Sequence, residues 1–167
     1  MKSRHILVFY VWLFMVFTLT ICCKDKVKEE AMYALRVGEL SDVILSMSLA
    51  CINQVKAYSA VWEYSQVTGE DFDSAARHIL GAERAETKGQ FSLNKMNLDD
   101  FMQKVKSPPE KYRSSHEKLL EMYSLYIKLN DLALKPTAPQ EEYEASVHKL
   151  YDKLLKEAGE LNTLLER

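Results

Sequence analysis

The side chains of this 167-residue chain best suited to metal or redox chemistry are its four histidines and three cysteines. A di-iron site in a helical protein needs Glu-x-x-His pairs on facing helices. The residues three positions before the histidines are Lys2, Ala75, Arg113 and Ala145, and none of these is acidic. Covalent haem attachment needs Cys-x-x-Cys-His, a run that the sequence lacks. Met47 and His148 are imaginable ligands of a noncovalent haem, but His148 lies beside the apolar stripe of its helix and not on it, so we predict that the protein carries no cofactor.

A nucleophilic thiol is the next chemistry to consider. Cys51 is the only cysteine beyond the N-terminal segment, and it lies on an apolar helical stripe between Met47 and Val55. A catalytic thiol needs a neighbouring histidine and an exposed, electropositive setting. We therefore predict that Cys51 is buried and unreactive and that no disulfide bond cross-links the fold. We also predict that the protein is not an enzyme.

A group of polar residues is the best candidate for a ligand or metal site. Glu83, Glu86 and Gln90 occupy positions that would continue an apolar stripe, and His78 lies on a nearby turn. Carboxylate and imidazole side chains gathered on one face can bind a cation. A solvated, overhanging helix end explains the same residues without a ligand, and we favour it. A ligand or metal site formed by His78, Glu83 and Glu86 is the alternative.

Aromatic side chains are the candidates for contact with a partner. Tyrosine combines a large apolar ring with a polar tip, which suits it to interfaces. Trp62, Tyr112, Tyr123 and Tyr126 can therefore form a surface that meets a protein or a glycan. The other interpretation, which we favour, places these rings in the core with their hydroxyl groups at its rim.

Helices must position all of these residues, because apolar side chains recur at three- and four-residue steps. Four such stripes cover residues 37–62, 72–105, 112–133 and 143–165, and no alternating run beyond residue 22 is long enough for a strand. Amphipathic helices joined by short turns bury their stripes against one another. We predict an all-α chain with an antiparallel four-helix bundle domain over residues 23–167, which we call the body.

Two kinds of boundary are predicted inside the body. Ser107 to Glu110 and Thr137 to Gln140 have the composition of capping boxes at the starts of the third and fourth helices. The stripe of the second helix weakens over residues 81–90. We expect that helix to bend or break near Gly89.

The first 22 residues resemble a targeting segment in composition. Lys2 and Arg4 supply positive charge, and residues 6–21 carry none. Sixteen helical residues span about 24 Å, less than the ~30 Å hydrocarbon core of a bilayer, which favours an export signal over a span. We predict that residues 1–22 are a signal peptide or a membrane anchor helix, and either one places the body outside the cytoplasm.

The end of this segment, Leu19-Thr20-Ile21-Cys22, resembles the lipobox of bacterial lipoproteins. In that family the cysteine is lipidated and becomes the mature N-terminus. The resemblance implies that Cys22, or Cys23 in the adjacent register, carries the lipid. A lipoprotein, an uncleaved anchor and a plain secretory signal remain the three alternatives.

A second resemblance, to uncharacterised bacterial lipoproteins and secreted helical-bundle proteins, rests on a proline turn and the aromatic-rich helix after it. The residues that carry it are Lys106-Ser107-Pro108-Pro109-Glu110-Lys111-Tyr112, His116, Leu119-Leu120, Met122-Tyr123, Tyr126, Leu132-Ala133, Pro136 and Tyr143. Trp62 matches a tryptophan in the first helix of these proteins. The resemblance implies a secreted helical bundle and supplies no activity.

Charge narrows the range of partners. Without Lys2 and Arg4 the chain carries 20 basic and 24 acidic side chains, a formal charge of −4. A chain of this charge lacks the excess of positive side chains that binds nucleic acid. We expect a non-catalytic interaction module, attached to a membrane of the bacterial cell envelope by its N-terminal segment, that contacts another envelope protein. The alternative is a sensor or carrier bundle that binds a small ligand or a metal.

Overall fold

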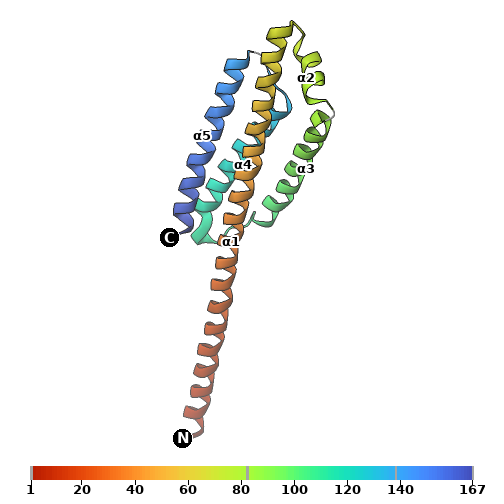
Figure 1. The fold of residues 1–167 in the computed structure, drawn as a ribbon. Coiled ribbons are helices and arrows are strands. Elements are labelled where there is room, and N and C mark those ends of the chain that lie inside the picture. The colour runs from red at the N-terminus through yellow and green to blue at the C-terminus, as the bar shows by residue number, and fades with distance from the viewer. Residues whose placement is uncertain (1, 82, 138, 167) are drawn as a thin grey trace.

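The fold is known from a computed structural model, which describes residues 2–81, 83–137 and 139–166, with side chains from Lys26 onward except that of Glu83. These residues form five α-helices and one short 3-10 helix, and no strand: α1 (Lys2–Thr68), α2 (Phe72–Leu80), α3 (Glu83–Lys104), η1 (Glu110–Tyr112), α4 (Arg113–Leu134) and α5 (Gln140–Leu165). The prediction of an all-α fold is confirmed over this part of the chain (Figure 1).

The segment predicted to be a signal peptide or membrane anchor, which we call the leader, lies in the same helix as the first core-forming helix of the body. That helix, α1, runs from Lys2 to Thr68 without interruption. The side chains of Cys22 and Cys23 lie outside the described residues, so their lipidation stays a prediction. Over the part of the chain with described side chains, no helix combines the length and apolar character that a membrane span requires.

The core is built mainly where α1, α4 and α5 lie side by side, with α4 and α5 running in opposite directions (Figure 1). Each helix turns one apolar stripe inward, as its spacing predicts, and burial of each large apolar side chain contributes roughly 1.5–3 kcal/mol. The most completely buried of these side chains are Val37, Ile44, Leu119, Met122, Tyr126, Leu129, Val147, Leu154 and Leu161.

The second predicted helix is broken into α2 and α3, and the expected break near Gly89 is wrong. The chain turns at Gly81, where φ is 48° and ψ is −132°, and α3 continues through Gly89. Glycine adopts a positive φ without the steric cost that a Cβ atom brings, which explains the position of the break. α2 begins at Phe72, and the preceding Asp71 caps it with a carboxylate that accepts a hydrogen bond of 3.0 Å from the Ser74 N–H.

Neither predicted capping box forms. Pro109 precedes η1 and Pro139 precedes α5, and neither helix start has a side-chain capping hydrogen bond. The carbonyls of Pro109 and Pro139 instead accept the first backbone hydrogen bonds of these helices, from the N–H groups of Tyr112 at 2.9 Å and Tyr143 at 3.2 Å. Each helix therefore starts two residues later than its box predicts, beyond the reach of the serine or threonine.

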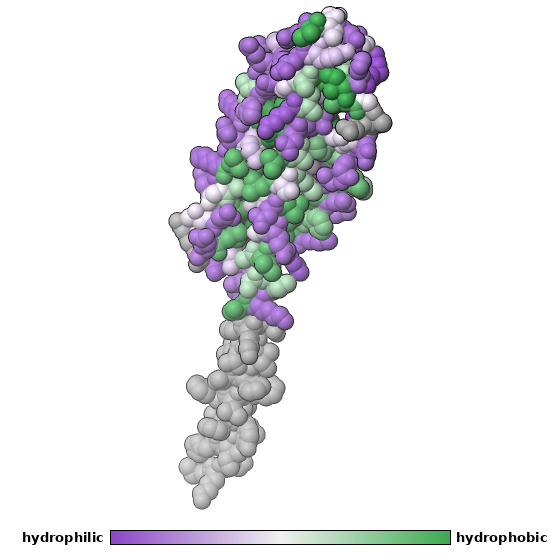
Figure 2. All heavy atoms as spheres, viewed as in Figure 1, coloured by the Kyte–Doolittle hydropathy of each residue, from purple (hydrophilic) through white to green (hydrophobic). Residues whose placement is uncertain are grey.

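α3 is attached to the body by one stripe, formed by Phe91, Leu98 and Met102, which are buried against α1 and α4. On the face of the body shown in Figure 2, hydrophilic and hydrophobic side chains are interspersed. The outer side of α3 contributes to this mixed surface, since Leu93 and Met96 remain exposed.

Candidate functional site

The structure corrects the interpretation of the four aromatic residues as a surface for a partner. Trp62, Tyr112 and Tyr126 are core residues with exposed fractions of 9%, 7% and 0%. Tyr123 is half-buried, and its hydroxyl donates a hydrogen bond to the carboxylate of Asp99. These rings lie on the same stripes as the aliphatic core residues, so the neighbouring helices cover them.

Aromatic rings pack together in two separate clusters at opposite ends of the body, and Tyr126 belongs to neither. At the end where α1 meets α2, Trp62 packs on Phe72 with ring centroids 4.8 Å apart and on Tyr143 at 5.4 Å. Near the start of the body, Tyr33 packs on Tyr112 at 5.8 Å. The candidate aromatic residues are thus not brought together at one place.

Two of the three candidate ligand residues have exposed side chains. His78 is exposed on α2, with its Nδ1 atom 3.5 Å from the Tyr64 hydroxyl. Glu86 is exposed on α3, and the side chain of Glu83 lies outside the described residues. Among the described side chains, no three His, Cys, Asp or Glu groups gather as a metal ion would require.

A hollow of about 310 Å³ opens beside this region, between the start of α3 and the ends of α1 and α4. Its polar lining includes Arg84 and Lys88, and neither His78 nor Glu86 lines it. The guanidinium of Arg84 forms an ion pair of 3.3 Å with Asp73. Because Asp73 offsets the charge of Arg84, Lys88 carries the uncompensated charge of the described lining, and a cation there suits an anionic ligand better than a metal ion.

Cys51 is buried, with an exposed fraction of 1%, as its position on the stripe predicts. Burial in apolar surroundings raises the pKa of its thiol to about 12. At neutral pH the sulfur is therefore protonated, and the nucleophilic thiolate is not populated.

A polar link that sequence spacing does not reveal joins α1, α4 and the end of α3. The Tyr33 hydroxyl lies 2.9 Å from Nδ1 of His116 and 3.2 Å from the carbonyl of Val105. When Nδ1 carries a proton, His116 donates to Tyr33 and Tyr33 donates to Val105, so every group is satisfied. Burial lowers the pKa of His116 and raises that of Tyr33 to about 12.

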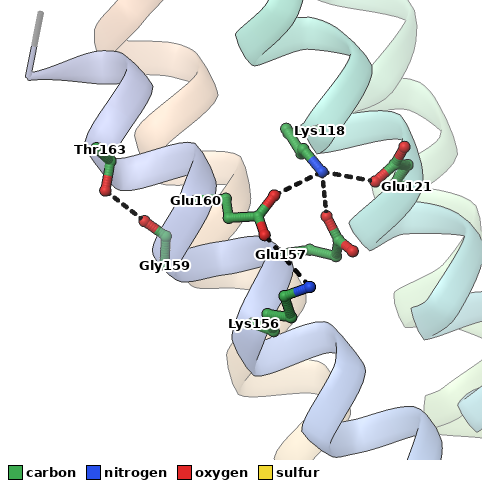
Figure 3. A network of polar contacts seen from close by, with 7 residues as sticks. All are labelled: Lys118, Glu121, Lys156, Glu157, Gly159, Glu160 and Thr163. Carbon is green, nitrogen blue, oxygen red and sulfur yellow. Dashed lines mark hydrogen bonds and ion pairs between the residues drawn. The ribbon is translucent and has the colours of Figure 1, made fainter.

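The strongest charge cluster joins α4 to α5 (Figure 3). Nζ of Lys118 lies 2.6 Å from Glu157, 2.7 Å from Glu160 and 3.1 Å from Glu121. The Glu157 side chain is only 7% exposed. Hydrogen bonds to these carboxylates, first of all to Glu157, raise the pKa of Lys118, and the bond from Lys118 lowers the pKa of Glu160.

Two smaller polar contacts also fasten helices together. The hydrogen bond from Tyr123 lowers the pKa of Asp99, and burial followed by that same bond raises the pKa of Tyr123 to about 12. The Ser59 hydroxyl donates to Glu144 over 2.5 Å, and this bond lowers the pKa of the Glu144 carboxyl.

Each of these polar networks joins one helix to another, and hydrogen bonds from neighbouring donors lower the pKa of Asp99, Glu144 and Glu160. The described hollows lie on the surface and expose cationic side chains. Comparison with protein-family models, curated proteins and solved structures finds no match to this chain.

Proposed function

We propose that this protein is an extracytoplasmic component of the cell envelope that is attached to a membrane by residues 1–22 and acts by contact, without catalysis. In this proposal residues 23–167 form an antiparallel four-helix bundle, in which α2 and α3 together take the second position. The partner is another envelope protein, and nucleic acid is not a partner. Lipid on Cys22 or Cys23, or an uncleaved leader, provides the attachment.

The continuity of α1 is the observation that supports this proposal best. The uncharged run of residues 6–21 and the first core-forming stretch of the chain belong to one helix, Lys2–Thr68. The positively charged start and the apolar run of the sequence have the form of an export signal or anchor. A helix that leads directly from such a segment into the core would hold the body close to the membrane.

α3 is the helix that we propose meets the partner. Its inner stripe, including Leu98, is buried, whereas Leu93 and Met96 on its outer side are 46% and 56% exposed. Leu93 and Met96 are three residues apart and therefore neighbours on one side of the helix, where together they offer apolar surface to the groove of a partner protein. The buried Trp62 cluster is not needed for this contact.

Mass spectrometry of the intact protein isolated from its native membrane tests the attachment. We expect either a diacylated N-terminal peptide that begins at Cys22 or Cys23, or a complete leader that starts at Met1. Recovery of the full-length chain free in the cytosol would contradict the proposal.

Photo-crosslinking in the native cell tests the contact. A photoreactive amino acid is placed at Leu93 or Met96, and the matched control carries it at Leu155, which is 46% exposed on α5. We expect both α3 positions to cross-link to the same envelope protein, and Leu155 to give no such product. Equal cross-linking from all three positions would show that α3 is not the contact face.

A further inference from the structure

The interface between α1 and α3 contains two hollows that lie one after the other along α1. We call the one nearer the N-terminus of α1 the lower hollow and the other the upper hollow. The upper hollow, of about 260 Å³, has mainly apolar walls, formed by Leu40, Val43, Phe101 and Val105. The lower hollow, of about 540 Å³, includes Lys28, Tyr33 and Ser107 in its lining. Arg36 and Lys104 line both hollows, so the two are parts of one groove with cations at the junction.

The junction is positively charged. Among the described residues, neither Arg36 nor Lys104 forms an ion pair with a carboxylate. Nζ of Lys104 instead lies 4.6 Å from the centre of the Phe101 ring. The carboxylates of Glu29 and Glu39 each line only one of the two hollows, whereas the two cations line both.

The connection between α3 and α4, part of which lines the lower hollow, adds positive charge near that hollow. Lys106 and Lys111 are both exposed in this connection. Its single carboxylate, Glu110, pairs with Arg113 and so does not neutralise them. Cations gathered around a concave surface raise the local concentration of anions.

The upper hollow offers apolar surface that the protein's own helices leave uncovered. Phe101 is 42% exposed, and Leu40 and Val105, which line the same hollow, have exposed fractions of 7% and 1%. An apolar chain lying over these side chains would remove both its own surface and that of Phe101 from water.

We propose that this groove binds a single-chain anionic lipid, with its acyl chain in the upper hollow and its phosphate between Arg36 and Lys104. A guanidinium group binds a phosphate through two parallel hydrogen bonds, and a lysine adds a point charge. The upper hollow alone is smaller than a usual small-molecule site of about 300–1,000 Å³, but the two hollows taken together as one groove fall within that range. The groove lies on the inner edge of α3, so this inference does not depend on the partner proposed for its outer face.

The experiment uses the full chain in nanodiscs of phosphatidylcholine that contain lysophosphatidic acid with a photoreactive group in its acyl chain. After irradiation, mass spectrometry locates the lipid on the protein. We expect the label on the segments that contain Val43 and Phe101. The double variant Arg36→Gln/Lys104→Gln should lose about tenfold in labelling, because two charge-assisted contacts with the phosphate are removed.

A matched variant, Lys128→Gln/Lys149→Gln, removes two exposed lysines from α4 and α5 and should label like the native chain. Phe101→Ser should also lower the labelling, while circular dichroism of every variant reports unchanged helix content. Equal labelling by a zwitterionic lysophosphatidylcholine probe, complete competition by inorganic phosphate, or an equal loss in the matched variant would each overturn the proposal. None of these outcomes bears on the cross-links from Leu93 and Met96, so the two proposals fail separately.

Discussion

Two serines of α1 illustrate how differently one residue type behaves in this core. The Ser48 hydroxyl is fully buried and has no hydrogen-bond partner among the described residues. Ser59, farther along the same helix, donates to the carboxylate of Glu144. A buried hydroxyl without a partner loses its hydrogen bonds to water and gains none in return, so the two serines should affect stability with opposite signs.

We expect Ser48→Ala to raise the free energy of unfolding by about 1 kcal/mol, because the unsatisfied hydroxyl is removed and alanine favours the helix. Ser59→Ala should lower it by about 1 kcal/mol, because the bond to the ionised Glu144 carboxylate is lost. Urea unfolding followed by circular dichroism measures both. A loss of stability in Ser48→Ala would show that its hydroxyl has a partner.

The Asp99 carboxyl gives a prediction for the dependence of stability on pH. Its pKa is held below the ordinary value, first by the hydrogen bond from Tyr123 and then by Lys95. A carboxyl with a lowered pKa in the folded state stabilises the fold above its unfolded pKa of about 4, and loses this effect as pH falls through the folded value.

Tyr123→Phe should therefore destabilise the protein at pH 7 and should approach the stability of the native chain at pH 3. Urea midpoints at the two pH values provide the measurement. Tyr151→Phe is the control, since Tyr151 is partly buried on α5 and forms none of the hydrogen bonds described here. A Tyr123→Phe deficit that is the same at both pH values would mean that the lost contact is only packing.

At the scale of the elements, the helical stripes could be predicted from sequence and their interruptions could not. Apolar spacing places Val37, Leu119 and Leu154 on buried faces because the helical period is fixed by backbone geometry. The break at Gly81 has no such period, and its glycine looks in sequence like that at Gly89. The same stripes carry the aromatic residues, which is why spacing alone could not distinguish a buried ring from an exposed one.

The two glycines should therefore respond in opposite ways to a methyl group. Gly81→Ala should destabilise the protein by about 1 kcal/mol or more, because alanine is strained at a positive φ. Gly89→Ala should stabilise it by up to about 1 kcal/mol, because Gly89 is in the interior of α3 and a Cβ atom there meets no neighbour within 4 Å. Thermal unfolding of the two variants tests this, and a stabilising Gly81→Ala would rule out the strained turn.

For the whole molecule, the contacts that join distant helices were the features hardest to predict. Lys118 and Glu157 are 39 residues apart, and Tyr33 and His116 are 83 residues apart. Lysine and glutamate recur on every exposed helix face, so sequence offers no reason to pair these particular residues. Which residues meet depends on how α1, α4 and α5 are rotated against one another, and the packing of the apolar core decides that rotation.

The cluster at Lys118 should matter more to stability than an ordinary surface pair. Lys118→Ala removes the cation that pairs with the nearly buried Glu157 and leaves that carboxylate beside Glu121 and Glu160, so the urea midpoint should fall clearly. Lys156→Ala removes only the exposed contact with Glu160 and should change the midpoint little. Double-mutant cycles with Glu157→Gln measure the coupling, and equal effects of the two lysine variants would mean that the cluster is only a surface network.

The contact between the last turn of α5 and α1 determines where a reporter attached to the protein would be. Leu165 lies against Gly38, with its Cδ1 atom 3.9 Å from the position of a Cβ atom on that glycine. A fluorophore or epitope fused after α5 therefore sits at the end of the body from which the leader departs. One inserted in the turn at Gly69 would stand about 45 Å away, given 1.5 Å of rise for each residue of α1. The distances of the two labels from a bilayer would report the angle between the axis of α1 and the membrane surface.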